Sequence, residues 1–189
     1  MKRNAILWCL VLSALLCVPA FGLDVAGVAL PDTAAVSGKT LALVGGGVRT
    51  KTIFRVKVYV GGLYMESPSK DAAEVIGSDQ AKRMVMHFLY KEVSREKLVD
   101  GWNDGFEKNS KDSLPALKER IDAFNAFFDG SVRKGEEVVM TYVPGAGTEV
   151  SIKGEVRGTI EGKDFMEALF KIWFGKYPAD SGLKESILK

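Results

Sequence analysis

The chain has 189 residues, 47% of them hydrophobic and 26% charged, with 26 lysines and arginines against 24 aspartates and glutamates. If the N-terminal leader described below, residues 1–22, is removed together with Lys2 and Arg3, the balance becomes 24 against 24 over 167 residues. That is an ordinary length for one domain with its own core. Proteins that bind nucleic acid or anionic membranes usually carry net or clustered positive charge, so the sequence argues against both kinds of partner.

The N-terminus has the pattern of a secretory signal peptide. Lys2 and Arg3 supply positive charge, residues 5–18 are almost entirely apolar, and small residues around Gly22 offer a cleavage site. The apolar run is shorter than the ~20 residues that span a bilayer. We predict cleavage after Gly22, a mature domain at residues 23–189 in the periplasm or outside the cell, and no stable membrane span in the mature protein. An uncleaved N-terminal anchor is the alternative.

Few residues offer metal-binding or nucleophilic chemistry. Both cysteines, Cys9 and Cys17, lie in the leader, so the mature domain can hold neither a disulfide nor a thiolate metal site. The single histidine, His87, stands in an apolar strand-like run, where a structural histidine is favoured over a metal ligand. The sequence motifs of catalytic triads are missing. We therefore predict no metal, no cofactor and no catalytic residue.

Strands dominate the first half of the chain. Residues 25–30 and 40–44 have the composition of short strands, and the glycines at 45–47 that of a turn. The segment 52–65 is rich in valine, phenylalanine, isoleucine and tyrosine, and its apolar side chains alternate with others at the period of a half-buried strand. A further strand is predicted over 83–90.

Two helices are predicted after these strands. Ser94 has the character of an N-cap, and Trp102, Phe106 and Asn109 follow it at helical spacings and share one face. A second helix, with proline near its first turn and an apolar stripe, is predicted over 115–130. Their aromatic faces indicate a helical layer packed over a sheet.

The last third returns to strands. Segments 136–142, 149–153 and 157–160 are short strands in hairpin spacing. An amphipathic helix over 164–175 follows, and then a short helix near the C-terminus. The whole order predicts an α+β fold, with a largely antiparallel sheet and a helical layer on one face.

Arg49 is the first candidate for a binding residue. It directly follows the glycine-rich segment and precedes a strand, where rigid backbone can aim a guanidinium at a carboxylate or enolate oxygen. A surface arginine that pairs with a neighbouring acid is the alternative. Similarly, the face formed by Trp102, Phe106 and Asn109 can belong to the core, with Asn109 as a residue at the helix end.

Several long segments, in order, resemble the chalcone isomerase family and its bacterial relatives. Residues 45–49 and 54–65 resemble the opening strands of that family, and residues 98–109 resemble its first cleft helix. Residues 142–148 and 168–175 resemble its closing hairpin and helix, so the resemblance covers nearly all of the mature chain. It implies a cleft between sheet and helices, where the plant isomerases use an arginine, a threonine, a tyrosine and an asparagine.

Carried over by position, only part of that catalytic set is present. Arg49 matches the arginine and Asn109 the asparagine, but Tyr59 stands in place of the threonine and Trp102 in place of the tyrosine. Ile172 stands where a hydroxyl or similar residue lines the far wall. The isomerisation needs oxygen donors aimed at the developing enolate charge, and replacing two hydroxyls by an indole and an alkyl group removes them.

The resemblance therefore implies a non-catalytic binder of a fatty acid or similar amphipathic anion. Relatives that bind fatty acids pair an arginine with a tyrosine at the carboxylate end of the cleft, and Arg49 with Tyr59 resembles that pair. A structural or interaction protein with a closed cleft, or an isomerase, are the alternatives. The predicted ligand-binding residues are Arg49, Tyr59, Trp102, Phe106, Asn109 and Ile172.

Overall fold

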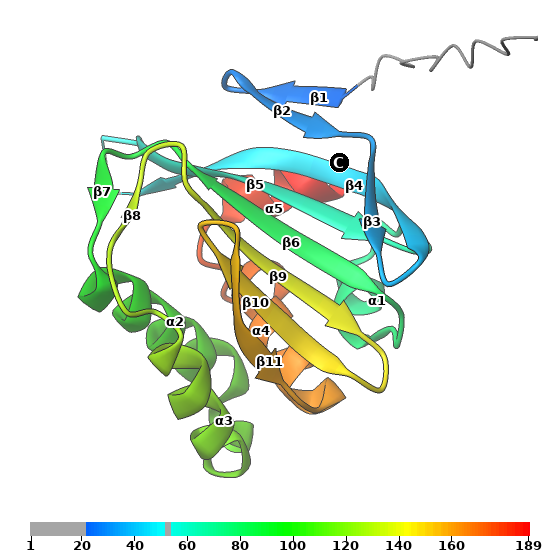
Figure 1. The fold of residues 1–189 in the computed structure, drawn as a ribbon, viewed down its shortest axis with the longest axis vertical. Coiled ribbons are helices and arrows are strands. Elements are labelled where there is room, and N and C mark those ends of the chain that lie inside the picture. Colours follow the sequence, from blue (N-terminus) through cyan, green and yellow to red (C-terminus); the bar gives the residue numbers. More distant parts are fainter. Residues whose placement is uncertain (1–21, 52–53) are drawn as a thin grey trace, which may run out of the picture.

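A computed structural model describes residues 22–51 and 54–189. The predicted leader, apart from Gly22, lies outside the described residues, and so do the two cysteines. A curled sheet of seven antiparallel strands forms the centre of the molecule, with strand order β11-β10-β9-β6-β5-β4-β3 (Figure 1). Together with its helices it confirms the predicted α+β fold with a largely antiparallel sheet.

The central sheet contains β3 (Thr33–Val36), β4 (Lys39–Lys51), β5 (Val56–Met65), β6 (Lys82–Phe88), β9 (Glu137–Val143), β10 (Gly147–Ile152) and β11 (Glu155–Ile160). Two smaller antiparallel pairs are β1 (Gly22–Val25) with β2 (Val28–Pro31), and β7 (Glu92–Val93) with β8 (Val132–Arg133). The helices are α1 (Ala72–Gly77), α2 (Arg95–Ser110), α3 (Leu114–Ala126), α4 (Lys163–Phe174) and α5 (Ser181–Leu188).

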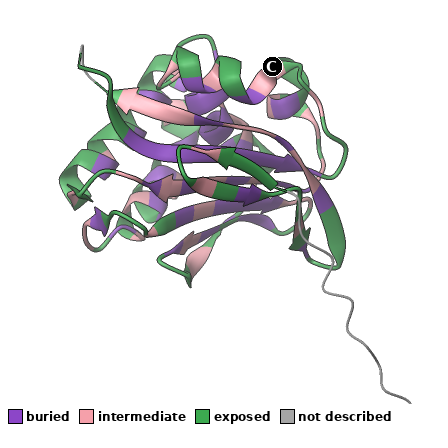
Figure 2. Cartoon of the chain, turned by 90° about the horizontal axis from the view of Figure 1, so that it is seen from above, coloured by how far each residue is buried: buried purple, intermediate pink, exposed green. Residues whose placement is uncertain are grey.

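The main hydrophobic core joins one face of the sheet to the helices. Side chains such as Tyr59, Leu63 and Met86 belong to the same buried cluster as Trp102 of α2 and Trp173 of α4. Burial is concentrated in this layer, and the outer faces of the helices are exposed (Figure 2). Within residues 22–51 and 54–189 the structure contains no helix long and apolar enough to cross a membrane.

The predicted turn over residues 45–47 is wrong, because β4 runs through all three glycines. A Cβ at Gly45 would meet the backbone carbonyl of Ile187, and one at Gly47 would lie 2.6 Å from Ser186 Cβ, both in α5. On the opposite face, a Cβ at Gly46 would meet Leu30 of β2. The glycines therefore serve the close approach of other elements to the strand rather than a turn. Arg49, two residues beyond Gly47 on the same face, comes after the part of β4 that α5 covers.

Helix α2 is fixed beside α4 by close packing. Ser94 caps it as predicted, since its hydroxyl accepts a hydrogen bond from Lys97 N at 3.4 Å. A Cβ at Gly105 would lie 2.9 Å from two carbons of Ile172, so only glycine permits this approach of α2 to α4. The rings of Trp102 and Trp173, one from each helix, meet at 5.7 Å in an edge-to-face arrangement. This packing holds one wall of the site described next.

Candidate functional site

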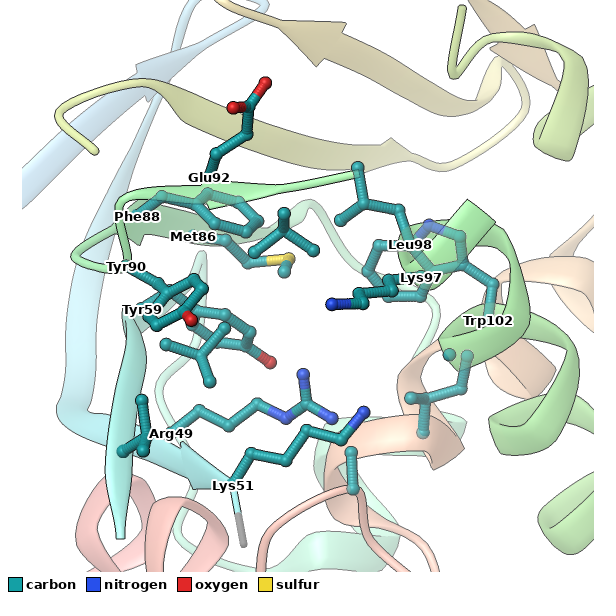
Figure 3. Close-up of a pocket in the computed structure, with 16 residues that line it drawn as sticks. Arg49, Lys51, Tyr59, Met86, Phe88, Tyr90, Glu92, Lys97, Leu98 and Trp102 are labelled. Carbon is teal, nitrogen blue, oxygen red and sulfur yellow. The ribbon is translucent and has the colours of Figure 1, made fainter. Parts of the chain in front are cut away.

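A cavity of about 290 Å³ lies between the end of the sheet and the first two turns of α2 (Figure 3). Ligand pockets in proteins span roughly 300–1,000 Å³, so its size suits a small or medium ligand. Its walls are mostly hydrocarbon, from Val58, Met86, Phe88, Leu98, Trp102 and Ile172. Its polar groups come from Arg49, Lys51, Tyr59, Tyr90, Glu92 and Lys97.

Strand register places Arg49 beside Tyr59. Arg49 of β4 pairs with Tyr59 of β5, which in turn pairs with Phe88 of β6. The guanidinium carbon of Arg49 lies 5.5 Å from the centre of the Tyr59 ring, close enough for a cation–π contact. The Arg49 side chain points into the cavity (Figure 3), and its buried Nε has no hydrogen-bond partner in the described part of the chain. One strong donor is thus left unused at the cavity wall.

The hydroxyl of Tyr59 is set as a second donor. Tyr59 is only 2% exposed, and its hydroxyl oxygen accepts a hydrogen bond of 2.8 Å from Trp173 Nε1. Burial raises the pKa of Tyr59 above its ordinary value, although the charge of Arg49 opposes the shift, so the hydroxyl keeps its proton at neutral pH. Because the indole N–H already occupies the oxygen as a donor, the hydroxyl hydrogen is free to be donated to another acceptor. Figure 3 shows this oxygen at the cavity.

Two lysines that the sequence analysis did not single out also reach into the cavity. They are Lys51, two residues after Arg49 in β4, and Lys97, in the first turn of α2 (Figure 3). Two patterns in the sequence could have indicated them. Alternation along β4 places Lys51 on the face of Arg49, and a helical spacing of four places Lys97 on the face of Gly101, which also lines the cavity.

Among the described residues that line the cavity, Glu92 is the one acidic residue. The carboxylate of Glu92 points away from the cavity (Figure 3). It accepts a hydrogen bond from Ser131 and lies 3.4 Å from Arg133 Nε. The Ser131 hydrogen bond, and then the charge of Arg133, lower the pKa of Glu92. The interior of the cavity is therefore positively charged.

The structure brings four of the six predicted site residues to the cavity. Trp102 and Ile172 line its wall together with Arg49 and Tyr59.

The other two, Phe106 and Asn109, do not line the cavity. Phe106 lies about one helical turn beyond Trp102 along α2, and Asn109 nearly two turns beyond it. Phe106 packs against the rings of Phe124 and Phe165 in the core. The amide of Asn109 donates to Tyr177 O at 2.9 Å and accepts from Tyr177 N at 2.9 Å. It joins the end of α2 to the segment after α4.

His87 lies on β6, where its neighbours Met86 and Phe88 point to the opposite face of the sheet. Its Nδ1 is 3.1 Å from Glu137 Oε1 on the adjacent strand. Throughout the part of the chain that the structure describes, no group of three or more histidine, cysteine, aspartate or glutamate residues is arranged to hold a metal ion.

Comparison with known proteins agrees with the geometry. Residues 22–189 match the sequence model of the chalcone isomerase-like family. Among solved structures, the fold is similar to that of a fatty-acid binding protein from Arabidopsis thaliana, with a TM-score of 0.69 and 16% sequence identity over 86% of this chain and 92% of that one. None of the curated proteins matches the sequence significantly. The chain belongs to the chalcone isomerase-like family.

Proposed function

We propose that this protein binds a fatty acid or a similar amphipathic anion in the cavity, without catalysing a reaction. One observation carries the proposal: Arg49, whose Nε is unpaired among the described residues, and the hydroxyl of Tyr59 lie side by side at a cavity whose walls are mostly hydrocarbon. The likeness in fold to a protein that is named for fatty-acid binding also supports it.

In the proposed complex, the headgroup accepts hydrogen bonds from Arg49 and Tyr59. A charge-assisted hydrogen bond contributes about 1.5–3 kcal/mol. The tail lies against hydrocarbon walls such as Phe88, Trp102 and Ile172, and each buried CH₂ group adds about 0.8 kcal/mol. The headgroup thus fixes orientation, and the tail supplies most of the affinity.

A binding role fits the cavity better than isomerisation. Of the positions that the resemblance assigns to hydroxyl-bearing or similar residues of the isomerases, Tyr59 keeps a hydroxyl, but the other two are Trp102 and Ile172 here, and both line the cavity. Ile172 has no polar atom, and Trp102 presents an aromatic ring to the wall, so neither supplies an oxygen donor for developing enolate charge. A purely structural role with a closed cleft is disfavoured because the cavity, about 290 Å³ in volume, is present.

Replacing the arginine tests the proposal. We expect Arg49→Ala to weaken the binding of dodecanoate by roughly 10- to 100-fold, because one charge-assisted contact is lost. The binding of dodecanol should barely change, because its uncharged hydroxyl makes no charge-assisted contact with Arg49. Isothermal titration calorimetry of both ligands against both proteins measures the difference.

Arg157→Ala is a matched control, because Arg157 pairs with Asp129 and does not line the cavity. Equal dodecanoate affinity in wild type and Arg49→Ala would show that Arg49 does not bind the headgroup and has a structural role instead. If neither ligand bound to the wild type, the protein would instead fit the structural or interaction class.

We also propose that the protein is exported, so that this cavity operates in the periplasm or outside the cell. The positive, apolar and small-residue pattern of residues 1–22 supports this. We expect N-terminal sequencing of the protein from fractionated source cells to begin at Leu23. A cytoplasmic protein that retains Met1 would contradict the proposal.

A further inference from the structure

Three cationic side chains converge on the cavity that we propose as the fatty-acid site. Arg49, Lys51 and Lys97 come from β4 and α2, and all three point into the same space (Figure 3). Among the ion pairs of the described residues, none includes any of these three. The acid that lines the cavity, Glu92, is directed to Ser131 and Arg133.

The charge of this cluster exceeds what one carboxylate can balance. A carboxylate carries a single negative charge and would leave two cations of the cluster unmatched. A phosphate monoester carries about −1.5 to −2 at neutral pH and has three strong acceptor oxygens. From this excess we infer that the preferred ligand is a single-chain amphiphile whose headgroup is a phosphate monoester. The inference rests on the proposed function, because it uses the same cavity and the same apolar walls.

The donor geometry suits a phosphate. The planar fork of Arg49 can give two parallel hydrogen bonds to one pair of phosphate oxygens. The ammonium groups of Lys51 and Lys97 act as point charges on flexible stems and can approach the remaining oxygens. The Tyr59 hydroxyl adds a neutral donor. Of the acids near the cavity, Glu92 is turned away from it. Asp180, whose charge acts on Tyr59, accepts hydrogen bonds from the backbone N–H and the hydroxyl of Thr50.

Calorimetric titration with ligands of one chain length separates the effect of headgroup charge on affinity from the effect of headgroup shape. The series is dodecyl phosphate, dodecyl sulfate, dodecanoate and dodecanol, with inorganic phosphate as the ligand that lacks a tail. The three amphiphilic anions are used below their critical micelle concentrations, and dodecanol below its solubility limit. At neutral pH we expect dodecyl phosphate to bind roughly 10- to 100-fold more tightly than dodecanoate. Dodecyl sulfate has three terminal oxygens but one charge, so it should bind like dodecanoate. Inorganic phosphate should bind far more weakly than dodecyl phosphate, because the tail supplies most of the affinity.

Two further measurements test whether the lysines recognise the double charge of the phosphate. Lys51→Met and Lys97→Met keep most of the length of the unbranched side chain and remove its charge. Each should reduce dodecyl phosphate affinity more than dodecanoate affinity. Lowering the pH to about 5 protonates the phosphate, whose second pKa is near 6. The advantage of dodecyl phosphate over dodecyl sulfate should then shrink, because the sulfate keeps its single charge at both pH values.

The outcomes distinguish this inference from the proposed function. Dodecanoate binding as tightly as dodecyl phosphate would overturn the inference and leave the proposed function standing. Inorganic phosphate binding as tightly as dodecyl phosphate would overturn the assignment of an amphiphile. If no member of the series bound to the wild-type protein, both the inference and the proposed function would fall.

Discussion

Replacing Gly101 by phenylalanine is expected to weaken ligand binding by roughly 10- to 100-fold without unfolding the protein. Gly101 lines the cavity, and a Cβ built on it meets no heavy atom within 4 Å. A new ring at this position can occupy the apolar space of the cavity, where burial of phenylalanine gains about 1.5–3 kcal/mol that a ligand must then displace. The helix itself should tolerate the change, because glycine is the weaker helix former.

Gly101→Ala separates occlusion from any effect on the helix. Its single methyl group leaves most of the cavity open, so ligand affinity should stay within about twofold of wild type, and α2 should gain about 0.5–1 kcal/mol of stability. Titration calorimetry with dodecanoate and dodecyl phosphate measures the affinities, and thermal melting monitors the fold. Wild-type affinity in a folded Gly101→Phe protein would place the ligand outside this cavity.

Replacing Phe124 by alanine should cost the most stability, about 3–5 kcal/mol in the free energy of unfolding. Phe124 of α3 is 0% exposed. Its ring lies 5.6 Å from that of Trp102 and 5.3 Å from that of Phe128, and also packs against Phe106 and Phe165. Truncation leaves a void at the point where α2, α3 and α4 meet. Urea denaturation followed by circular dichroism measures the change.

Phe54→Ala is the matched control, since it removes the same ring where the side chain is 82% exposed. Its effect should stay within about 0.5 kcal/mol. Phe124 packs against Trp102, which forms part of the cavity wall. Phe124→Ala should therefore also weaken ligand binding, whereas Phe54→Ala should change neither ligand binding nor folding. Equal unfolding free energies for the two variants would show that the aromatic cluster around Phe124 does not stabilise the packing of the helices.

Hydrophobic period and capping were sufficient to predict most elements of this fold. The alternation along 52–65 predicted β5, and the Ser94 cap with the aromatic spacing after it predicted α2. The glycines at 45–47 were misinterpreted because local sequence gives them the composition of a turn. Their actual role depends on α5, whose residues lie some 140 positions further along the chain. Tertiary contacts of that kind leave no local signal.

The residues of the site were predictable where the resemblance assigned them. They were less predictable where the extent of the cavity in the fold decides which residues line it. Arg49 and Tyr59 reach the cavity because strand register pairs them. Asn109 shares a helix face with Trp102 but lies beyond the end of the cavity. The even overall charge balance concealed the convergence of Lys51 and Lys97, which are far apart in sequence and meet only in the fold.

A crystal structure of the protein with dodecanoate tests the central claim most directly. We expect density for the carboxylate within hydrogen-bonding distance of the Arg49 guanidinium and the Tyr59 hydroxyl, with the tail against Trp102 and Ile172. Clear density for the ligand elsewhere on the protein, or an empty cavity in crystals grown at saturating dodecanoate, would contradict the claim that this cavity is the binding site.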